Sequence, residues 1–170
     1  ALAEIMGQPM IVRVLKAVEK SEKIDEVFAA TDDLRIKNAV EKAGGRAIMT
    51  SAQHQSGTDR IAEAAQEIEA ELIVNIQGDE PLIKAESIEQ ALKPFAAEPE
   101  LKMSTLKRKI TAAEAENPDL VKVITDQDDY ALYFSRSKVP YYRDAELNKQ
   151  QYFQHIGLYV YRRDFLLQYA

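Results

Sequence analysis

The residues best suited to chemistry follow a short apolar run. The segment Gln77–Pro81 (QGDEP) comes directly after Leu72–Ile76 (LIVNI). The apolar run predicts a buried strand, and open α/β sheets bind ligands at the carboxyl ends of their strands. A carboxylate at that edge, Asp79 above all, could hold Mg²⁺ against nucleotide phosphates or accept a hydrogen bond from a ribose hydroxyl. The alternative is a solvated turn in which Glu80 and Pro81 open the next helix.

A second polar segment, Gln53–Arg60, comes before a predicted helix. Ser56 and Thr58 are good helix caps, and Gly57 would let the backbone approach a ligand closely. The exposed amides of a helix N-terminus attract anions or the polar edge of a base. The alternative is ordinary capping, with Arg60 as a surface cation.

A third group of candidates lies in the second half of the chain. Arg136 ends a predicted strand, and its planar fork suits a carboxylate or a phosphate. His155 begins another strand, and Tyr159 shares its face because strand side chains alternate. Together the three could line a pocket for a hydroxylated acid. The alternatives are a surface arginine and a capped or partly buried histidine.

Composition narrows the class of protein. The chain has 170 residues, a net charge of −6 and no cysteine. The acidic balance argues against nucleic acid as a partner, and the absence of cysteine leaves no disulfide framework or zinc–thiolate site. Apolar runs are too short for membrane insertion, which takes about 20 residues. These properties predict one domain in a reducing cytoplasm.

Strand and helix patterns alternate through the first hundred residues, which predicts βαβ units and a mostly parallel sheet. Pro9 suits the first turn of a helix, and a later helix should stop at Gly44-Gly45. The expected strands are 27–30, 47–49 and 72–76. The helix that stops at Gly44-Gly45 should begin after residue 33, and the other expected helices span 57–70 and surround 88–95.

The second half is richer in strands. We expect strands at 103–109 and 156–161, a hairpin formed by 121–124 and 130–134, a loop over 138–152, and a last helix capped by Asp164. The chain begins almost at a helix, with no strand before it, and ends inside another helix. We therefore expect it to be the middle part of a longer protein.

Five blocks, taken together, resemble one family. They are Ala30–Asp33, His54 with Ser56–Arg60, Gln77–Pro81, Ala131–Ser137 and His155–Tyr159. In this order they are similar to the 3-deoxy-manno-octulosonate (Kdo) cytidylyltransferases, and the likeness covers essentially the whole chain. Sialic acid cytidylyltransferases are the nearest relatives by chemistry, but the Phe-Ser-Arg and His-Ile-Gly blocks fit the Kdo enzymes better.

The resemblance implies a nucleotide-diphospho-sugar transferase fold, an α/β/α sandwich with a β-rich dimerisation region. It implies a nucleotide-binding half over about 1–100, a sugar-binding and dimerisation half over about 101–170, and a homodimer. The implied reaction joins CTP and Kdo into CMP-Kdo and pyrophosphate for lipopolysaccharide synthesis. The alternatives are an enzyme that activates sialic acid and a catalytically inert nucleotide-binding fragment.

The resemblance also assigns residues. Asp79 would hold Mg²⁺ against the triphosphate, and the cytidine site would be lined by Ser56, Gly57, Arg60 and Gln77. The sugar acid would be held by Arg136, His155 and Tyr159, with Arg136 opposite its carboxylate. Two parts of the family pattern are missing from this sequence: an N-terminal phosphate loop with its basic residues, and a C-terminal segment with a second metal-binding aspartate.

Overall fold

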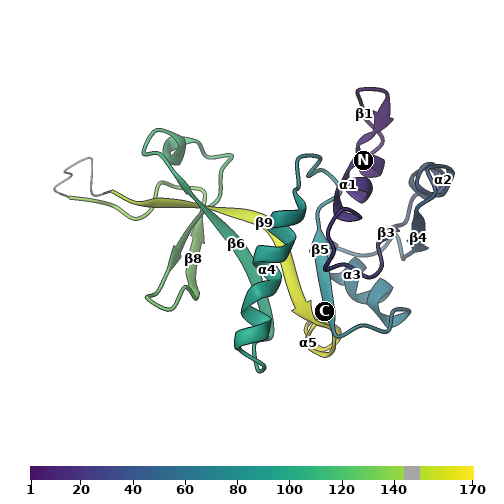
Figure 1. Ribbon diagram of the computed structural model, residues 1–170. Helices are drawn as coiled ribbons and strands as arrows, with labels where there is room; N and C mark the ends of the chain where they lie inside the picture. Colours follow the sequence, from purple (N-terminus) through teal and green to yellow (C-terminus); the bar gives the residue numbers. More distant parts are fainter. Residues whose placement is uncertain (144–149) are drawn as a thin grey trace. The chain divides into compact units, whose positions relative to one another are not determined.

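The computed structural model describes residues 1–143 and 150–170 (Figure 1). The chain divides into two compact units, which we call the larger unit (residues 1–104 and 158–170) and the smaller unit (105–157). The strands β6 (Met103–Ile110) and β9 (Tyr152–Arg162) contribute residues to both units.

The larger unit is an α/β assembly. In chain order its other elements are β1 (Glu4–Ile5), β2 (Gln8–Pro9), α1 (Met10–Val18), β3 (Phe28–Thr31), α2 (Leu34–Lys42), β4 (Arg46–Met49), α3 (Gly57–Gln66), β5 (Leu72–Ile76), α4 (Ala85–Ala97) and α5 (Arg163–Tyr169).

The predicted α/β class is confirmed, but its sheets are mixed. Strands β3 and β4 run parallel, as the βαβ pattern predicts. Strand β5 instead pairs antiparallel with the end of β9, from Leu72 opposite Arg162 to Ile76 opposite Leu158. The expectation of a mostly parallel sheet is therefore corrected, because β9 returns from the second half of the chain and pairs with β5.

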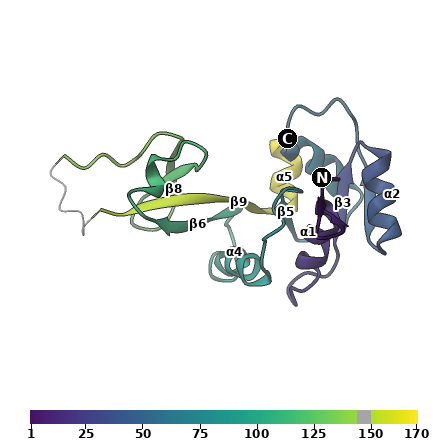
Figure 2. The same cartoon turned by 90° about the horizontal axis from the view of Figure 1, so that it is seen from above.

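Apolar stripes on the helices build the core of the larger unit. Leu15 on α1 packs with Ala29 on β3 and Val40 on α2. Gly45 lies against this cluster, where an added Cβ would meet Leu15 Cδ1 at 2.9 Å. A second cluster joins α3, β5 and α5, which lie together in Figure 2, through Ala65, Ile73, Leu166 and their neighbours.

Several helices and strands begin or end at other residues than the sequence predicts. The helix expected over 57–70 ends at Gln66. The final helix begins at Arg163, so Asp164 lies in its first turn, where it accepts a hydrogen bond from the amide of Phe165. The chain start also differs from expectation, because the short strands β1 and β2 precede α1.

The smaller unit is built mainly of antiparallel strands. It contains η1 (Glu114–Glu116), β7 (Lys122–Thr125), β8 (Ala131–Ser135) and parts of β6 and β9. β7 and β8 form the predicted hairpin, with Lys122 opposite Ser135. The buried core of the smaller unit contains Ile110, Ala115 and Tyr152. Part of the loop expected over 138–152 lies outside the described residues.

Candidate functional site

The N-terminus of α3 brings three of the predicted residues together. Ser56 is the N-cap, and its Oγ accepts a hydrogen bond from the amide of Asp59 at 3.1 Å. Gly57 is the first helical residue, and a Cβ built on it would lie 3.8 Å from Nε2 of Gln77. The side-chain amide of Gln77 therefore lies beside the opening of the helix. Because Ser56, Gly57 and Gln77 are all exposed, a ligand can reach both the helix amides and this side chain.

Arg60, one turn further along α3, points back toward the loops that follow β3 and β4. Its Nη1 donates to Thr50 Oγ1 at 2.6 Å and lies 3.2 Å from Asp32 Oδ1. The side chain keeps only 21% of its surface exposed. Arg60 is thus not the free surface cation of the alternative interpretation; it joins the segments at the carboxyl ends of two parallel strands.

Two further polar residues support the same loop and were not singled out from the sequence as site residues. The Oε2 atom of Glu63 accepts a hydrogen bond from the amide of Ser51 at 2.9 Å and contacts Nε2 of His54. The pKa of Glu63 is lowered, first by the hydrogen bond from His54 and then by the Ser51 amide. His54 and Glu63 lie on opposite sides of the start of α3 in the sequence, and this spacing matches no local motif. Their contact is therefore visible only in the folded structure.

Asp79 lies in the turn after β5. The turn is closed by the amide of Glu80, which donates to the carbonyl of Gln77 at 3.1 Å. Gly78 packs closely, since a Cβ there would lie 3.3 Å from Ile11 Cδ1 on α1. Helix α4 begins only at Ala85, so Glu80 and Pro81 do not open it; the segment is an exposed turn, as the alternative interpretation also holds.

The Asp79 carboxylate is exposed, and within residues 1–143 and 150–170 it has no side-chain hydrogen bond or ion pair. No cluster of three or more metal-ligating side chains occurs among the described residues. A single free carboxylate is compatible with Mg²⁺, which keeps several waters and is often held by one or two carboxylates together with substrate phosphates. The donor set therefore fits a metal that is shared with a nucleotide, and it does not fit a cage made of protein alone.

Arg136 follows β8 in the smaller unit. Its Nη1 donates to the carbonyl oxygens of Pro118 at 3.0 Å and Asp119 at 3.4 Å. The side chain is exposed, and its Nε and Nη2 have no partner among the residues described here. One edge of the guanidinium is therefore tied to the protein, and the other edge is available for bidentate binding of a carboxylate.

His155 is half-buried on β9 in the same unit. Its Nε2 lies 2.9 Å from Thr105 Oγ1, and its ring meets Phe134 edge-on at 5.0 Å between centroids. Burial lowers the pKa of His155, which favours the neutral imidazole near pH 7. A neutral imidazole can exchange hydrogen bonds with a hydroxylated ligand without adding charge.

Tyr159, the third residue of the predicted sugar site, belongs to the larger unit. It lies opposite Asn75 of β5 and stacks on Tyr161, with 6.1 Å between ring centroids. Burial raises the pKa of its phenol, so the group stays protonated and can donate a hydrogen bond at neutral pH.

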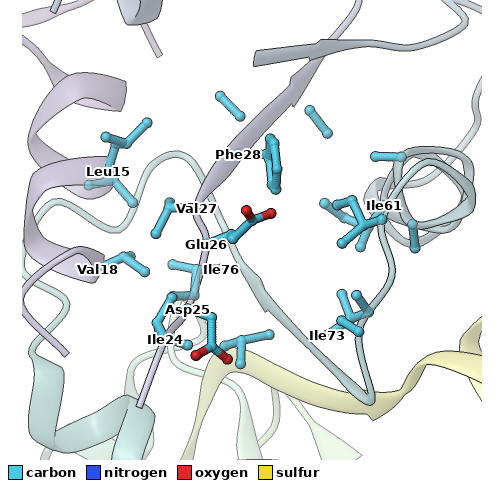
Figure 3. A pocket seen from close by; sticks show the side chains of 18 of the residues that line it. Leu15, Val18, Ile24, Asp25, Glu26, Val27, Phe28, Ile61, Ile73 and Ile76 are labelled. Atoms are coloured by element: carbon cyan, nitrogen blue, oxygen red, sulfur yellow. The ribbon is translucent and has the colours of Figure 1, made fainter. Parts of the chain in front are cut away.

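A cavity of about 750 Å³ lies inside the larger unit and is a separate feature (Figure 3). Its walls are mainly apolar side chains of α1, α3, β3, β5 and the residues just before β3, and the carboxylates of Asp25 and Glu26 also line it. None of the predicted nucleotide-binding residues lines it. Such a lining offers little to a charged nucleotide, so the polar site at the carboxyl ends of the strands remains the candidate. Helices long and apolar enough to cross a membrane are absent from the described chain.

Comparison with known proteins points to one class of enzyme. The sequence matches the cytidylyltransferase family over residues 1–170. It is 49% identical to 3-deoxy-manno-octulosonate cytidylyltransferase of Geotalea uraniireducens, over all of this chain and 72% of that protein. It is 45% identical to the enzyme of the same name from Escherichia coli, over 99% of this chain and 68% of that protein.

Solved structures agree in fold. The structure of CMP:2-keto-3-deoxy-manno-octonic acid synthetase complexed with CTP matches 99% of this chain and 69% of that one, at 44% identity and a TM-score of 0.92. The 4-diphosphocytidyl-2C-methyl-D-erythritol synthase of Anaerococcus prevotii matches 97% of this chain and 64% of that one, at 17% identity and a TM-score of 0.59. At that identity the second likeness concerns the fold alone.

Proposed function

This chain belongs to the cytidylyltransferase family, among the 3-deoxy-manno-octulosonate cytidylyltransferases, and on that premise we propose that it transfers CMP from CTP to Kdo for lipopolysaccharide biosynthesis. The resemblance recognised in the sequence is thereby confirmed. The observation that carries the proposal is the likeness to a CTP-bound synthetase of the same sugar acid over 99% of this chain, at a TM-score of 0.92.

In the proposed reaction an oxygen–phosphorus bond is exchanged. The anomeric hydroxyl of Kdo attacks the α-phosphorus of CTP, the bond to the β-phosphate oxygen breaks, and pyrophosphate leaves while the hydroxyl proton passes to solvent. Such transfers depend on positioning and charge neutralisation more than on covalent intermediates. The residues of this chain therefore need to hold two anionic substrates in line.

The nucleotide would bind at the opening of α3. Gln77 beside the first turn offers an amide that can both donate to and accept from the edge of a cytosine. Gly57 leaves the helix amides uncovered, and Arg60 keeps the loops after β3 and β4 in place through Thr50 and Asp32. Asp79 would hold Mg²⁺ beside the phosphates, and the bound ion would neutralise their charge.

The sugar acid would be held through its carboxylate and hydroxyls. Arg136 offers the free edge of its guanidinium to the carboxylate, and its other edge is already anchored at Pro118 and Asp119. In the same unit His155 supplies a neutral hydrogen-bonding group, because burial disfavours its charged form. Specificity for a hydroxylated acid would follow from this combination of one cation and one neutral imidazole. Tyr159 of the larger unit keeps its phenol protonated and able to donate a hydrogen bond.

We also propose a homodimer formed through β8. The large side chains around this strand are exposed, namely Tyr130 at 52%, Leu132 at 66%, Tyr133 at 59% and Phe134 at 43%. Exposed apolar patches of this kind mark interaction surfaces, and within residues 1–143 and 150–170 β8 pairs along one side, with β7. Sedimentation of the protein and of its Leu132→Lys variant would test the dimer. Use of CTP, a cytoplasmic nucleotide, supports a cytoplasmic location.

Pyrophosphate release tests the function directly. With CTP and Mg²⁺ present, release should require Kdo and should not occur with sialic acid. If pyrophosphate were released with sialic acid and not with Kdo, the proposed nucleotidyl transfer would stand, but the proposed sugar acid would be wrong. Absence of release with either acid would contradict the proposed activity.

A further inference from the structure

Lys122, the first residue of β7, is a lysine with no accessible surface. Its relative exposure is 0%, and it heads the largest fully buried side chains of the chain. No carboxylate forms an ion pair with it in residues 1–143 and 150–170. Burying an ammonium without a counter-charge is costly unless hydrogen bonds replace its water.

The contacts of Lys122 are three main-chain carbonyl oxygens. Its Nζ donates to Asn117 at 2.9 Å, to Leu120 at 2.7 Å and to the carbonyl of Arg136. An ammonium has three N–H donors and no acceptor. All of its donors are therefore used, and they join the loop before β7 to the residue that follows β8.

Arg136 contacts the same loop. Its guanidinium donates hydrogen bonds to the carbonyl oxygens of Pro118 and Asp119. Lys122 donates to the carbonyl oxygens of the residues before and after this pair, Asn117 and Leu120. The four carbonyls of Asn117–Leu120 thus each accept a hydrogen bond from one of the two cations. The loop is tightened further by Asn117, whose Oδ1 accepts from the amide of Asp119 at 2.9 Å.

We propose that Lys122 is the positioning residue of the sugar-acid site: it fixes both the backbone of Arg136 and the loop that holds the Arg136 guanidinium, so that the free edge of the fork faces the carboxylate of the substrate. This rests on the proposed function of Arg136. Lys122 itself touches no substrate, because its three donors are occupied and it has no exposed surface.

The substitution that tests this is Lys122→Met, which keeps an unbranched side chain, one atom shorter, and removes its donors. The KM for Kdo should rise about tenfold to a hundredfold, since displacement of a binding group by about 1 Å has effects of that order, while the KM for CTP should change less than about threefold. The matched control is Lys107→Met. That lysine lies in the same unit but donates to Thr125 and Asp129, so its loss should leave both constants near those of the wild type.

A double substitution separates positioning from general damage. If Lys122 acts through Arg136, Lys122→Met should have little further effect on Kdo binding in an Arg136→Ala background. Additive effects, or equal rises in both KM values, would overturn the proposal. Should Lys122→Met fail to fold, Asn117→Ala loosens the same loop without touching the buried ammonium, and it should shift KM for Kdo in the same direction.

A measurement without substrate keeps this proposal apart from the proposed activity. The side-chain N–H signals of Arg136, observed by ¹H–¹⁵N NMR, should show restricted rotation in the wild type and averaging in Lys122→Met or Asn117→Ala. Unchanged signals would overturn the positioning role whether or not the protein turns over Kdo. Changed signals with no turnover of Kdo would support the role of Lys122 and contradict the proposed substrate.

Discussion

The substitution Gly57→Ala separates stability from nucleotide binding at the opening of α3. An added Cβ would have Nε2 of Gln77 as its nearest neighbour, at 3.8 Å, which is an ordinary van der Waals contact. The glycine is the first residue of a helix, and its φ is outside the left-handed region. Alanine should therefore be accepted without strain and should stabilise the fold by about 0.4–1 kcal/mol, by restricting the unfolded chain.

The same methyl group should weaken CTP binding. It projects beside Gln77, over the amides where we place the nucleotide, so CTP would have to lie further from them. Loss of one close polar contact is worth about 1–1.5 kcal/mol, or roughly a tenfold rise in the KM for CTP. The melting temperature should rise by roughly 1–4 °C. Differential scanning calorimetry and initial rates of pyrophosphate release at varied CTP measure the two effects.

Gly45→Ala is the matched control, since it adds the same methyl group in the same unit. There the Cβ would meet Leu15 at 2.9 Å and Val40 at 3.0 Å, both buried, so overpacking should cost about 1–3 kcal/mol. The KM for CTP should stay unchanged. If Gly57→Ala is stabilised but binds CTP as tightly as the wild type, the nucleotide does not approach this helix end and the assignment of Gly57 is wrong.

Three further predictions concern the other proposed residues. Arg136→Ala should raise the KM for Kdo about tenfold to a hundredfold, because it removes a pair of charge-assisted hydrogen bonds. The KM for CTP should change little. Equal changes in both KM values would show that Arg136 does not belong to the sugar site. Asp79→Asn should lower turnover by about a hundredfold or more with an unchanged circular dichroism spectrum, and near-normal turnover at saturating Mg²⁺ would refute its role. Because burial depresses the pKa of His155 below its ordinary value of 6.5, the unfolded chain binds more protons just below that pH, and the free energy of unfolding should fall as the pH drops. Urea unfolding between pH 5 and 8 should show a shallower pH dependence for His155→Gln, and an identical slope would contradict this assignment.

Local sequence patterns predicted the elements that surround the proposed nucleotide site. The strand Leu72–Ile76 was predicted with its observed bounds, because a continuous apolar run between polar segments has few other structures available. The cap at Ser56 was also predicted correctly, since it depends on residues within one helical turn. Both features are local, which is why a single sequence sufficed.

Features that depend on contacts between residues far apart in the chain could not be predicted from the sequence. The antiparallel pairing of β5 with β9 joins residues more than eighty positions apart, and no local pattern encodes that partner. Lys122 lies within the predicted strand 121–124, and its residue type gives no sign of burial, since lysines ordinarily face water. Its burial follows from three carbonyls that converge only after the loop at 117–120 and the residue after β8 come together. The contacts of Arg60 with Asp32 and Thr50 were hidden for the same reason.

The cavity of the larger unit has a consequence for how the protein behaves in concentrated solution. In the described chain β3 pairs on one side with β4, and β5 on one side with β9, so each strand has an unpaired edge along the apolar wall. Unpaired strand edges beside apolar surface are templates for adding strands from other chains. The 170-residue chain should therefore be prone to edge-to-edge aggregation, and storage at low concentration is preferable.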